Sequence, residues 1–185
     1  MRPQRDLYIL AASLVFWGMG EGLFFIFQPL YIQEFGADPV LIGTILGITA
    51  AIMTLAQVPF GYLSDHYGRR TILWSSWLLG VCATLTMALA NTLAIFIVGL
   101  LLYALTAAVL GPMNSYIAAA RGGWSVGKAL TFISASYSVG AAFAPMVGGM
   151  IAERTGLRSV YIISTVIFVI STTLIFLIRK QPVEQ

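Results

Sequence analysis

Charged residues are scarce in this sequence, and their scarcity decides the class of protein. Only 9% of the 185 residues are Asp, Glu, Lys or Arg, whereas 59% are hydrophobic. Soluble domains carry roughly a quarter of charged residues because they need a polar surface. This composition therefore predicts an integral membrane protein, whose main partner is the lipid bilayer.

Cysteine and histidine are almost absent as well. The single cysteine, Cys82, supports no disulfide within the chain and no multi-cysteine metal site, and we interpret it as a small core residue. The single histidine, His66, is interpreted as a surface residue. One histidine and one buried glutamate supply neither a metal site nor a catalytic cluster, so we expect no metal, no cofactor and no enzymatic activity.

Long apolar runs dominate the rest of the chain. A hydrocarbon core of ~30 Å takes about 20 helical residues to cross, and backbone groups in lipid must pair within each span. Turn and charge signals separate the runs, and the first run is too long for a signal peptide. We expect one bundle over residues 1–185, with membrane-spanning helices at 8–32, 40–63, 71–90, 93–119, 128–152 and 160–178.

The ten basic residues lie thinly between these runs, which does not indicate nucleic-acid binding. Their placement indicates topology instead, since cytoplasmic loops carry an excess of Lys and Arg. With a cytoplasmic N-terminus, that side holds Arg2, Arg5, Arg69, Arg70, Arg121, Lys128, Arg179 and Lys180, and the other side only Arg154 and Arg158. We expect a multi-pass protein of the plasma membrane, the inner membrane of the cell, with both termini cytoplasmic.

One loop carries a recognisable motif. After the second expected helix the chain reads Gly61-Tyr62-Leu63-Ser64-Asp65-His66-Tyr67-Gly68-Arg69-Arg70. This resembles the signature G-x-x-x-D-R-x-G-R-R of the major facilitator superfamily, with His66 in place of the usual Arg or Lys. The resemblance implies a conformational latch that favours the outward-facing state, made by Gly61, Asp65, Gly68, Arg69 and Arg70. The alternative is that the arginines only anchor the loop and Asp65 is solvated.

A weaker copy of the motif follows the fifth expected helix. Its residues are Gly149, Glu153, Arg154, Gly156 and Arg158, at the spacing of Gly61, Asp65, His66, Gly68 and Arg70. Because an odd number of spans separates the copies, they lie on opposite faces. This predicts an all-α membrane protein with six transmembrane helices as two inverted three-helix repeats, the architecture of half of a major facilitator fold.

Small residues recur in two helices. Gly43 and Gly47 lie four apart in the second, which predicts close helix packing. The fifth reads Gly140-Ala141-Ala142-Phe143-Ala144-Pro145-Met146-Val147-Gly148-Gly149. It resembles the G-x-x-x-G-P-x-x-G-G element of proton-coupled exporters in the superfamily, with Ala144 replacing a Gly. We identify Gly140, Pro145, Gly148 and Gly149 as a packing element that favours export, and thus an antiporter.

Polar residues inside the apolar runs indicate a substrate or proton path. Glu21 lies near the middle of the first helix, where an ionisable group is costly unless it faces a cavity or a partner. We interpret it as a proton or cation site; the alternative is a neutral structural carboxylic acid bonded to a neighbouring helix. Helical spacing places Trp17, Phe24 and Gln28 beside it. The other candidates are Tyr103, Asn114 and Tyr137.

The leading hypothesis is a secondary active transporter of a small solute, proton-coupled and exporting, acting as or within a half-transporter. The aromatic, weakly charged helix face favours a neutral, amphipathic or cationic substrate. The resemblance implies a second six-helix half, of the same or a different chain, because complete members have the substrate site between two such bundles; that half is absent from this sequence. The alternative is a non-transporting bundle or truncated fragment with a structural or interaction role.

Overall fold

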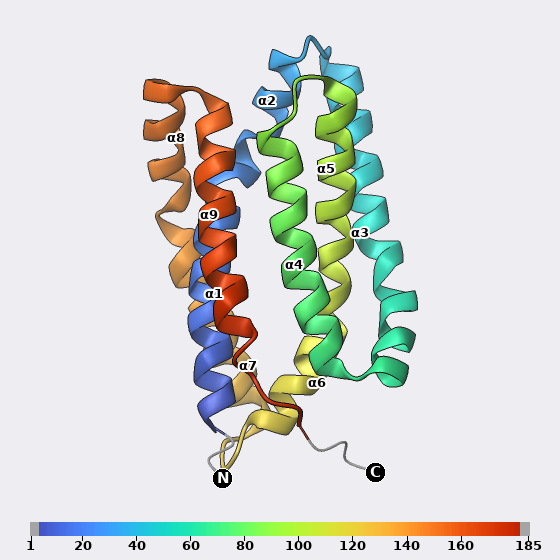
Figure 1. Ribbon diagram of the computed structural model, residues 1–185, viewed down its shortest axis with the longest axis vertical. Coiled ribbons are helices and arrows are strands. Elements are labelled where there is room, and N and C mark those ends of the chain that lie inside the picture. The colour runs from blue at the N-terminus through green and yellow to red at the C-terminus, as the bar shows by residue number, and fades with distance from the viewer. Residues whose placement is uncertain (1–3, 182–185) are drawn as a thin grey trace.

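The computed structural model describes residues 4–181, and helices account for the regular structure of that range. They form an elongated bundle whose long axis the longer helices follow (Figure 1). Within residues 4–181, six segments are long and apolar enough to cross a membrane, which confirms the expected number. They are Gln4–Glu34, Pro39–Tyr67, Arg69–Ala88, Leu93–Ala120, Val126–Thr155 and Leu157–Ile175.

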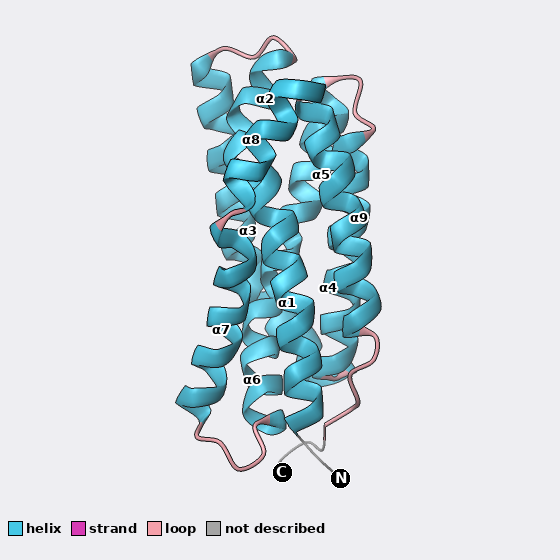
Figure 2. Ribbon diagram, turned by 90° about the vertical axis from the view of Figure 1, so that its left-hand side faces the viewer, coloured by secondary structure: helices cyan, strands magenta, loops and turns pink. Residues whose placement is uncertain are grey.

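Three of the six spans are interrupted, and each interruption lies just before a proline. The first consists of α1 (Gln4–Phe24) and α2 (Gln28–Glu34), the fourth of α5 (Leu93–Thr106) and α6 (Leu110–Ala120), and the fifth of α7 (Val126–Ala142) and α8 (Ala144–Thr155). Pro29, Pro112 and Pro145 lack the N–H that would continue the helix, and their rings clash with the preceding turn. Figure 2 shows the break between α7 and α8.

The other three spans are single helices, α3 (Pro39–Tyr67), α4 (Arg69–Ala88) and α9 (Leu157–Ile175). Side-chain caps fix where several helices begin. Asp38 accepts a hydrogen bond from the amide of Leu41 at 2.8 Å at the start of α3, and Ser125 accepts one from Lys128 at 3.2 Å at the start of α7. Such caps satisfy amides that have no partner within the helix.

The packing has the pairwise pattern that two inverted repeats require. α1 packs against α7, α8 and α9, while α5 and α6 pack against α3 and α4. Exchanging the first span with the fourth, the second with the fifth and the third with the sixth converts one set of pairs into the other. A further pair, α4 with α9, maps onto itself under this exchange and joins the two repeats.

The two copies of the motif form the same turn. Gly68 joins α3 to α4 with φ 89° and ψ 143°, and Gly156 joins α8 to α9 with φ 85° and ψ 160°. The amide of each bonds to the carbonyl four residues earlier at 2.9 Å. Only glycine adopts this region of backbone space readily, which explains why both copies have glycine at this position.

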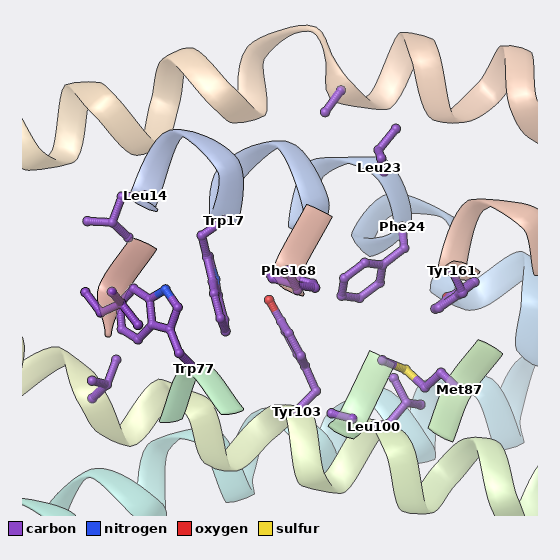
Figure 3. Close-up of a cluster of buried hydrophobic side chains, with 14 of the residues drawn as sticks. Leu14, Trp17, Leu23, Phe24, Trp77, Met87, Leu100, Tyr103, Tyr161 and Phe168 are labelled. Carbon is purple, nitrogen blue, oxygen red and sulfur yellow. The ribbon is translucent and has the colours of Figure 1, made fainter. Parts of the chain in front are cut away.

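Aromatic side chains fill the core between α1, α4, α5 and α9 (Figure 3). The Trp17 ring lies 4.9 Å from that of Trp77 and 4.4 Å from that of Phe168, centroid to centroid. A polar contact crosses the same region: Trp77 Nε1 donates to the hydroxyls of Ser13 and Ser171, at 2.9 Å each. Three spans are thereby held together by hydrogen bonds inside the apolar core.

Glycines bring α1 very close to the fifth span. A Cβ on Gly18 would collide with the Tyr137 carbonyl, and one on Gly140 with the Val15 carbonyl. Gly148 faces the Leu23 carbonyl in the same way. The close packing expected of the fifth helix is therefore present.

Two sequence expectations about packing are wrong. A Cβ added to Gly43 or Gly47 would meet no described atom within 4 Å, so the second span is not packed closely through them. They lie on an outer face of α3, which the other five spans leave open. Cys82 is also exposed on the outside of α4 rather than in the core, because the face of α4 that packs inward carries Trp77, Gly80 and Ala83 instead.

Both ends of the described chain, the start of α1 and the segment after α9, lie at the same end of the bundle (Figure 1). The junction of α3 and α4 and the loop from α6 to α7 also lie there, and these carry Arg69, Arg70, Arg121 and Lys128. Arg154 and Arg158 lie at the opposite end, at the junction of α8 and α9. Arg2 lies outside the described residues.

Candidate functional site

A cavity of about 340 Å³ lies beside the aromatic core, about halfway along the bundle. Five of the six spans contribute to its lining. The lining residues are Trp17, Glu21, Met53, Ser76, Trp77, Tyr103, Thr106, Ala107, Val109, Leu110, Met113, Ile133, Ser134, Tyr137 and Ser138. The cavity is within the size range of small-molecule sites, which are mostly apolar with a few placed polar groups.

Glu21 contributes the one carboxylate among these lining residues. The hydroxyl of Tyr137 donates a hydrogen bond to its Oε2 at 2.9 Å. This contact depends on the close approach of α1 and α7 at Gly18 and Gly140, since bulkier residues there would separate the two helices. The small residues in the sequence therefore place the two polar side chains within reach of each other.

An aromatic wall flanks the Glu21–Tyr137 pair. Trp17 and Tyr103 lie 6.4 Å apart between centroids, with their rings 15° from parallel. Gly80 makes room for the Trp17 indole, because a Cβ there would collide with the ring. The wall presents two flat apolar ring faces beside the carboxyl group of Glu21. The indole N–H of Trp17 and the hydroxyl of Tyr103 lie at the edges of these rings.

The break in the fourth span also borders the cavity. A 3₁₀ turn at Ala107–Val109 separates α5 from α6, and Thr106, Ala107, Val109 and Leu110 all line the space. The Thr106 hydroxyl bonds to the Tyr103 carbonyl within its own turn, at 2.7 Å. Irregular backbone at membrane depth is tolerated where it borders a cavity or packs inside protein.

Four of the seven predicted path residues meet at this cavity, namely Trp17, Glu21, Tyr103 and Tyr137. The other three do not line it. Phe24 is fully buried in the aromatic core, where its ring lies 5.2 Å from that of Tyr103, and Gln28 is buried nearer the end of the first span. Asn114 lies exposed on α6, one turn beyond the break.

The sequence did not single out Ser76, Trp77, Met53 or Met113, which also line the cavity. Ser76 is buried, and its hydroxyl has no hydrogen-bond partner within residues 4–181. No spacing signal separates these residues from their neighbours, because their helices are apolar over most of their surface.

The predicted latch residues lie at the junction of α3 and α4. Arg69 Nη1 donates to the Ser115 carbonyl of α6 at 3.2 Å, and Arg70 stacks on Trp74 with its Cζ 3.8 Å from the ring centroid. Asp65 is exposed, and a Cβ added to Gly61 would meet no described atom within 4 Å. The junction is thus tied to α6 through Arg69.

The predicted packing element of the fifth span surrounds the break between α7 and α8. Gly140 and Gly148 contact α1 above and below the break, and Pro145 lies at the start of α8. Gly149 is less crowded, because a Cβ added there would lie 3.6 Å from the Phe27 ring. Together they allow a bent helix to follow α1 closely along its length.

A six-span bundle with pseudo-symmetric repeats and a mostly apolar cavity at mid-depth defines a multi-pass membrane protein. Residues 10–185 match the model of the Major Facilitator Superfamily, and the chain belongs to that family. The resemblance of the loop at Gly61–Arg70 is therefore confirmed as a family relationship.

Curated relatives cover most of the chain. It is 28% identical to the multidrug resistance protein MdtG of Salmonella arizonae over 98% of the chain and 47% of that protein. It is 26% identical to an uncharacterized MFS-type transporter of Methanocaldococcus jannaschii over 84% of the chain and 40% of that protein. The chain spans about half the length of these curated relatives.

Two solved structures share the fold. The human organic anion transporter MFSD10 superposes with a TM-score of 0.78 and 14% identity, over 98% of this chain and 48% of that one. The POT family transporter PepTSo gives a TM-score of 0.82 at 14% identity, over 98% of this chain and 39% of that one. At this identity the likeness concerns the fold alone.

Proposed function

We propose that this chain is one six-helix half of a secondary active transporter for a small solute. The observation that supports this most directly is the Glu21–Tyr137 pair, which faces a cavity at mid-depth in the bundle. Ionisable residues at this depth are costly and usually serve an ion or substrate path. The family of the chain and its relatives named as transporters support the same function.

A second six-helix half, from the same or another chain, would complete the transporter. The chain spans about half the length of its curated relatives. Large apolar side chains remain exposed on the two outermost spans, including Val58 and Tyr62 on α3, Phe143 at the break before α8 and Met146 on α8. These faces are available to pack against another bundle.

We further propose that Glu21 exchanges a proton during transport. A carboxyl group next to a phenol in a mostly apolar cavity can hold a proton in one state and release it when water enters. The described residues that line the cavity include this acid and no Lys or Arg, which favours a neutral, amphipathic or cationic solute over a polyanion. The multidrug resistance name of the MdtG relatives agrees with an amphipathic substrate and with export.

The junction of α3 and α4 is the proposed latch. Arg69 ties this junction to the fourth span through the Ser115 carbonyl, so a rotation of the second and third spans against the fourth would break that bond. Gly61, Asp65 and Gly68 shape the loop that carries it. We place this loop and both termini on the cytoplasmic side of the plasma membrane, following the distribution of Lys and Arg.

Proteoliposomes containing the purified chain test the proposal. A fluorescent lipophilic cation such as ethidium and an entrapped pH indicator would be followed together under an imposed proton gradient. Coupled movement of dye and protons, lost in Glu21→Gln, supports the function. Detergent-resolved mass identifies the assembly that is active. If no assembly of the chain moves dye or protons, whether it is a monomer, a self-assembled oligomer or a pair with a second half, the chain is a non-transporting bundle.

A further inference from the structure

A second cavity, distinct from the mid-depth cavity, lies at the end of the bundle that carries both termini. Its volume is about 230 Å³, and it opens between α4, α6 and the residues that follow α9. Three cationic side chains line it, from Arg69, Arg70 and Lys180, and no Asp or Glu is among its described lining residues. Three converging cations without an acid make a site for an anion.

Arg70 is the residue best placed to hold that anion. Its guanidinium stacks on the Trp74 ring at 3.8 Å, which fixes its plane. Trp74 is itself held by a hydrogen bond from Nε1 to the Ile175 carbonyl at 3.0 Å. The Nε of Arg70 is buried and has no hydrogen-bond partner within residues 4–181. A buried unpaired donor on an arginine is costly, and an oxyanion with several acceptors would satisfy it.

Neutral groups complete the wall and hold the segment after α9 in place. Tyr116 donates its hydroxyl to the Arg179 carbonyl at 2.8 Å and so holds the segment after α9 against α6. Gln181 donates to Oδ2 of Asp6 at 2.8 Å, on the side of α1. In Figure 1 this segment runs from the end of α9 across to α6. Lys180, in the same segment, therefore lines the cavity together with Arg69 and Arg70.

The cavity lies where two apolar spans end, since Arg69 begins the third span directly after the second ends at Tyr67. An aromatic ring and cations at such a boundary are typical of the zone where lipid phosphates lie. We propose that this cavity binds a phosphate group through Arg70, Arg69 and Lys180. A phospholipid head group and a soluble phosphate share this chemistry, and the inference does not depend on transport.

Titration of the full chain, delipidated in a neutral detergent, tests the site. Dioleoylphosphatidylglycerol binding would be followed by native mass spectrometry, with dioleoylglycerol as the probe that has the same acyl chains without phosphate. Inorganic phosphate would be titrated separately, with thermal unfolding as the readout. We expect saturable binding of at least one phosphate probe, weakened about tenfold or more by Arg70→Gln.

Two further variants make the result decisive. Lys180→Gln changes an exposed side chain after the last helix, so it tests the site even where Arg70→Gln impairs folding; it should also weaken binding. Arg121→Gln removes one positive charge at the same end but outside the cavity, and it should leave binding unchanged. Binding of the lipid alone assigns a head group, and stabilisation by phosphate alone assigns a soluble anion. Equal binding of dioleoylglycerol, equal weakening by Arg121→Gln, or no binding of either phosphate probe overturns the proposal.

Discussion

The hydroxyl of Tyr137 and the carboxyl of Glu21 join the first and fifth spans by a 2.9 Å hydrogen bond at the edge of the mid-depth cavity. This contact separates the two interpretations of Glu21. A structural acid needs only a partner, and Tyr137 supplies one. A proton site also needs access to the cavity, and Glu21 lines it. The two roles differ in how transport responds to pH, so they are open to experiment.

Glu21→Gln is expected to abolish the pH dependence of transport while leaving the bundle folded. Glutamine keeps the size of the side chain and an oxygen that can accept the Tyr137 hydrogen bond, but it cannot release a proton. Substrate flux across a pH series in proteoliposomes is the measurement. An unchanged pH profile would assign Glu21 to a structural role.

Tyr137→Phe removes the hydroxyl and keeps the ring. We expect transport to retain its pH dependence, with the profile displaced, because the carboxyl remains but loses its hydrogen-bond partner. Ser138→Ala, on the next residue of the same helix and also at the cavity, is the matched control and should displace the profile less. A Tyr137→Phe profile identical to the wild type would show that the hydrogen bond does not influence the acid.

Gly140→Val is expected to destabilise the bundle strongly. The Gly140 Cα faces the Val15 carbonyl so closely that any Cβ collides with backbone, which neither helix can relieve without moving apart. Overpacking of this kind costs about 1–3 kcal/mol or more. Gly47→Val is the control, since it lies on the open face of α3. Thermal unfolding in detergent should show a large loss for the first variant and little for the second.

A comparison of two glycine pairs shows how far the sequence predicts the structure. Gly18 and Gly22 have the same four-residue spacing as Gly43 and Gly47, but only the first pair faces another helix. Spacing marks a surface that permits close approach, whereas the position of the neighbouring helix decides whether the approach takes place. The six spans were predictable because bilayer thickness sets their length and hydropathy.

The cavity was only partly predictable for a related reason. Glu21 stands out in the sequence because a carboxyl group is rare at membrane depth. Ser76 and Trp77 do not stand out, because α4 is apolar on most of its surface and periodicity does not reveal its rotation. That rotation is set by tertiary contacts, among them Gly80 against the Trp17 ring and Trp77 against Ser13.

Trp77→Phe tests the polar contact that joins α1, α4 and α9. Phenylalanine fills part of the indole's volume but cannot donate to Ser13 and Ser171. Interhelical hydrogen bonds in membranes contribute about 0.6–2 kcal/mol, and the smaller ring adds a packing loss. Trp124→Phe, in the loop before α7, provides a comparison with little expected effect on the free energy of unfolding. Equal stability of the two variants would show that the buried contact contributes nothing.

Gly68→Ala and Gly156→Ala test the equivalence of the two repeats. Both glycines have φ near +90° with ψ above 140°, a region in which an alanine side chain costs about 1–3 kcal/mol. Because the two turns share their geometry and neither has a crowded Cβ position, the two losses of stability should be similar and additive in the double variant. Gly127→Ala, in the first turn of α7 with equally open surroundings, controls for the methyl group itself and should be neutral or slightly stabilising. Each turn is also tied to a neighbouring span by an arginine, Arg69 to the Ser115 carbonyl and Arg158 to the Ala88 carbonyl. Unequal losses at Gly68 and Gly156 in thermal unfolding would show that the repeats share a backbone path but not the same energetic role.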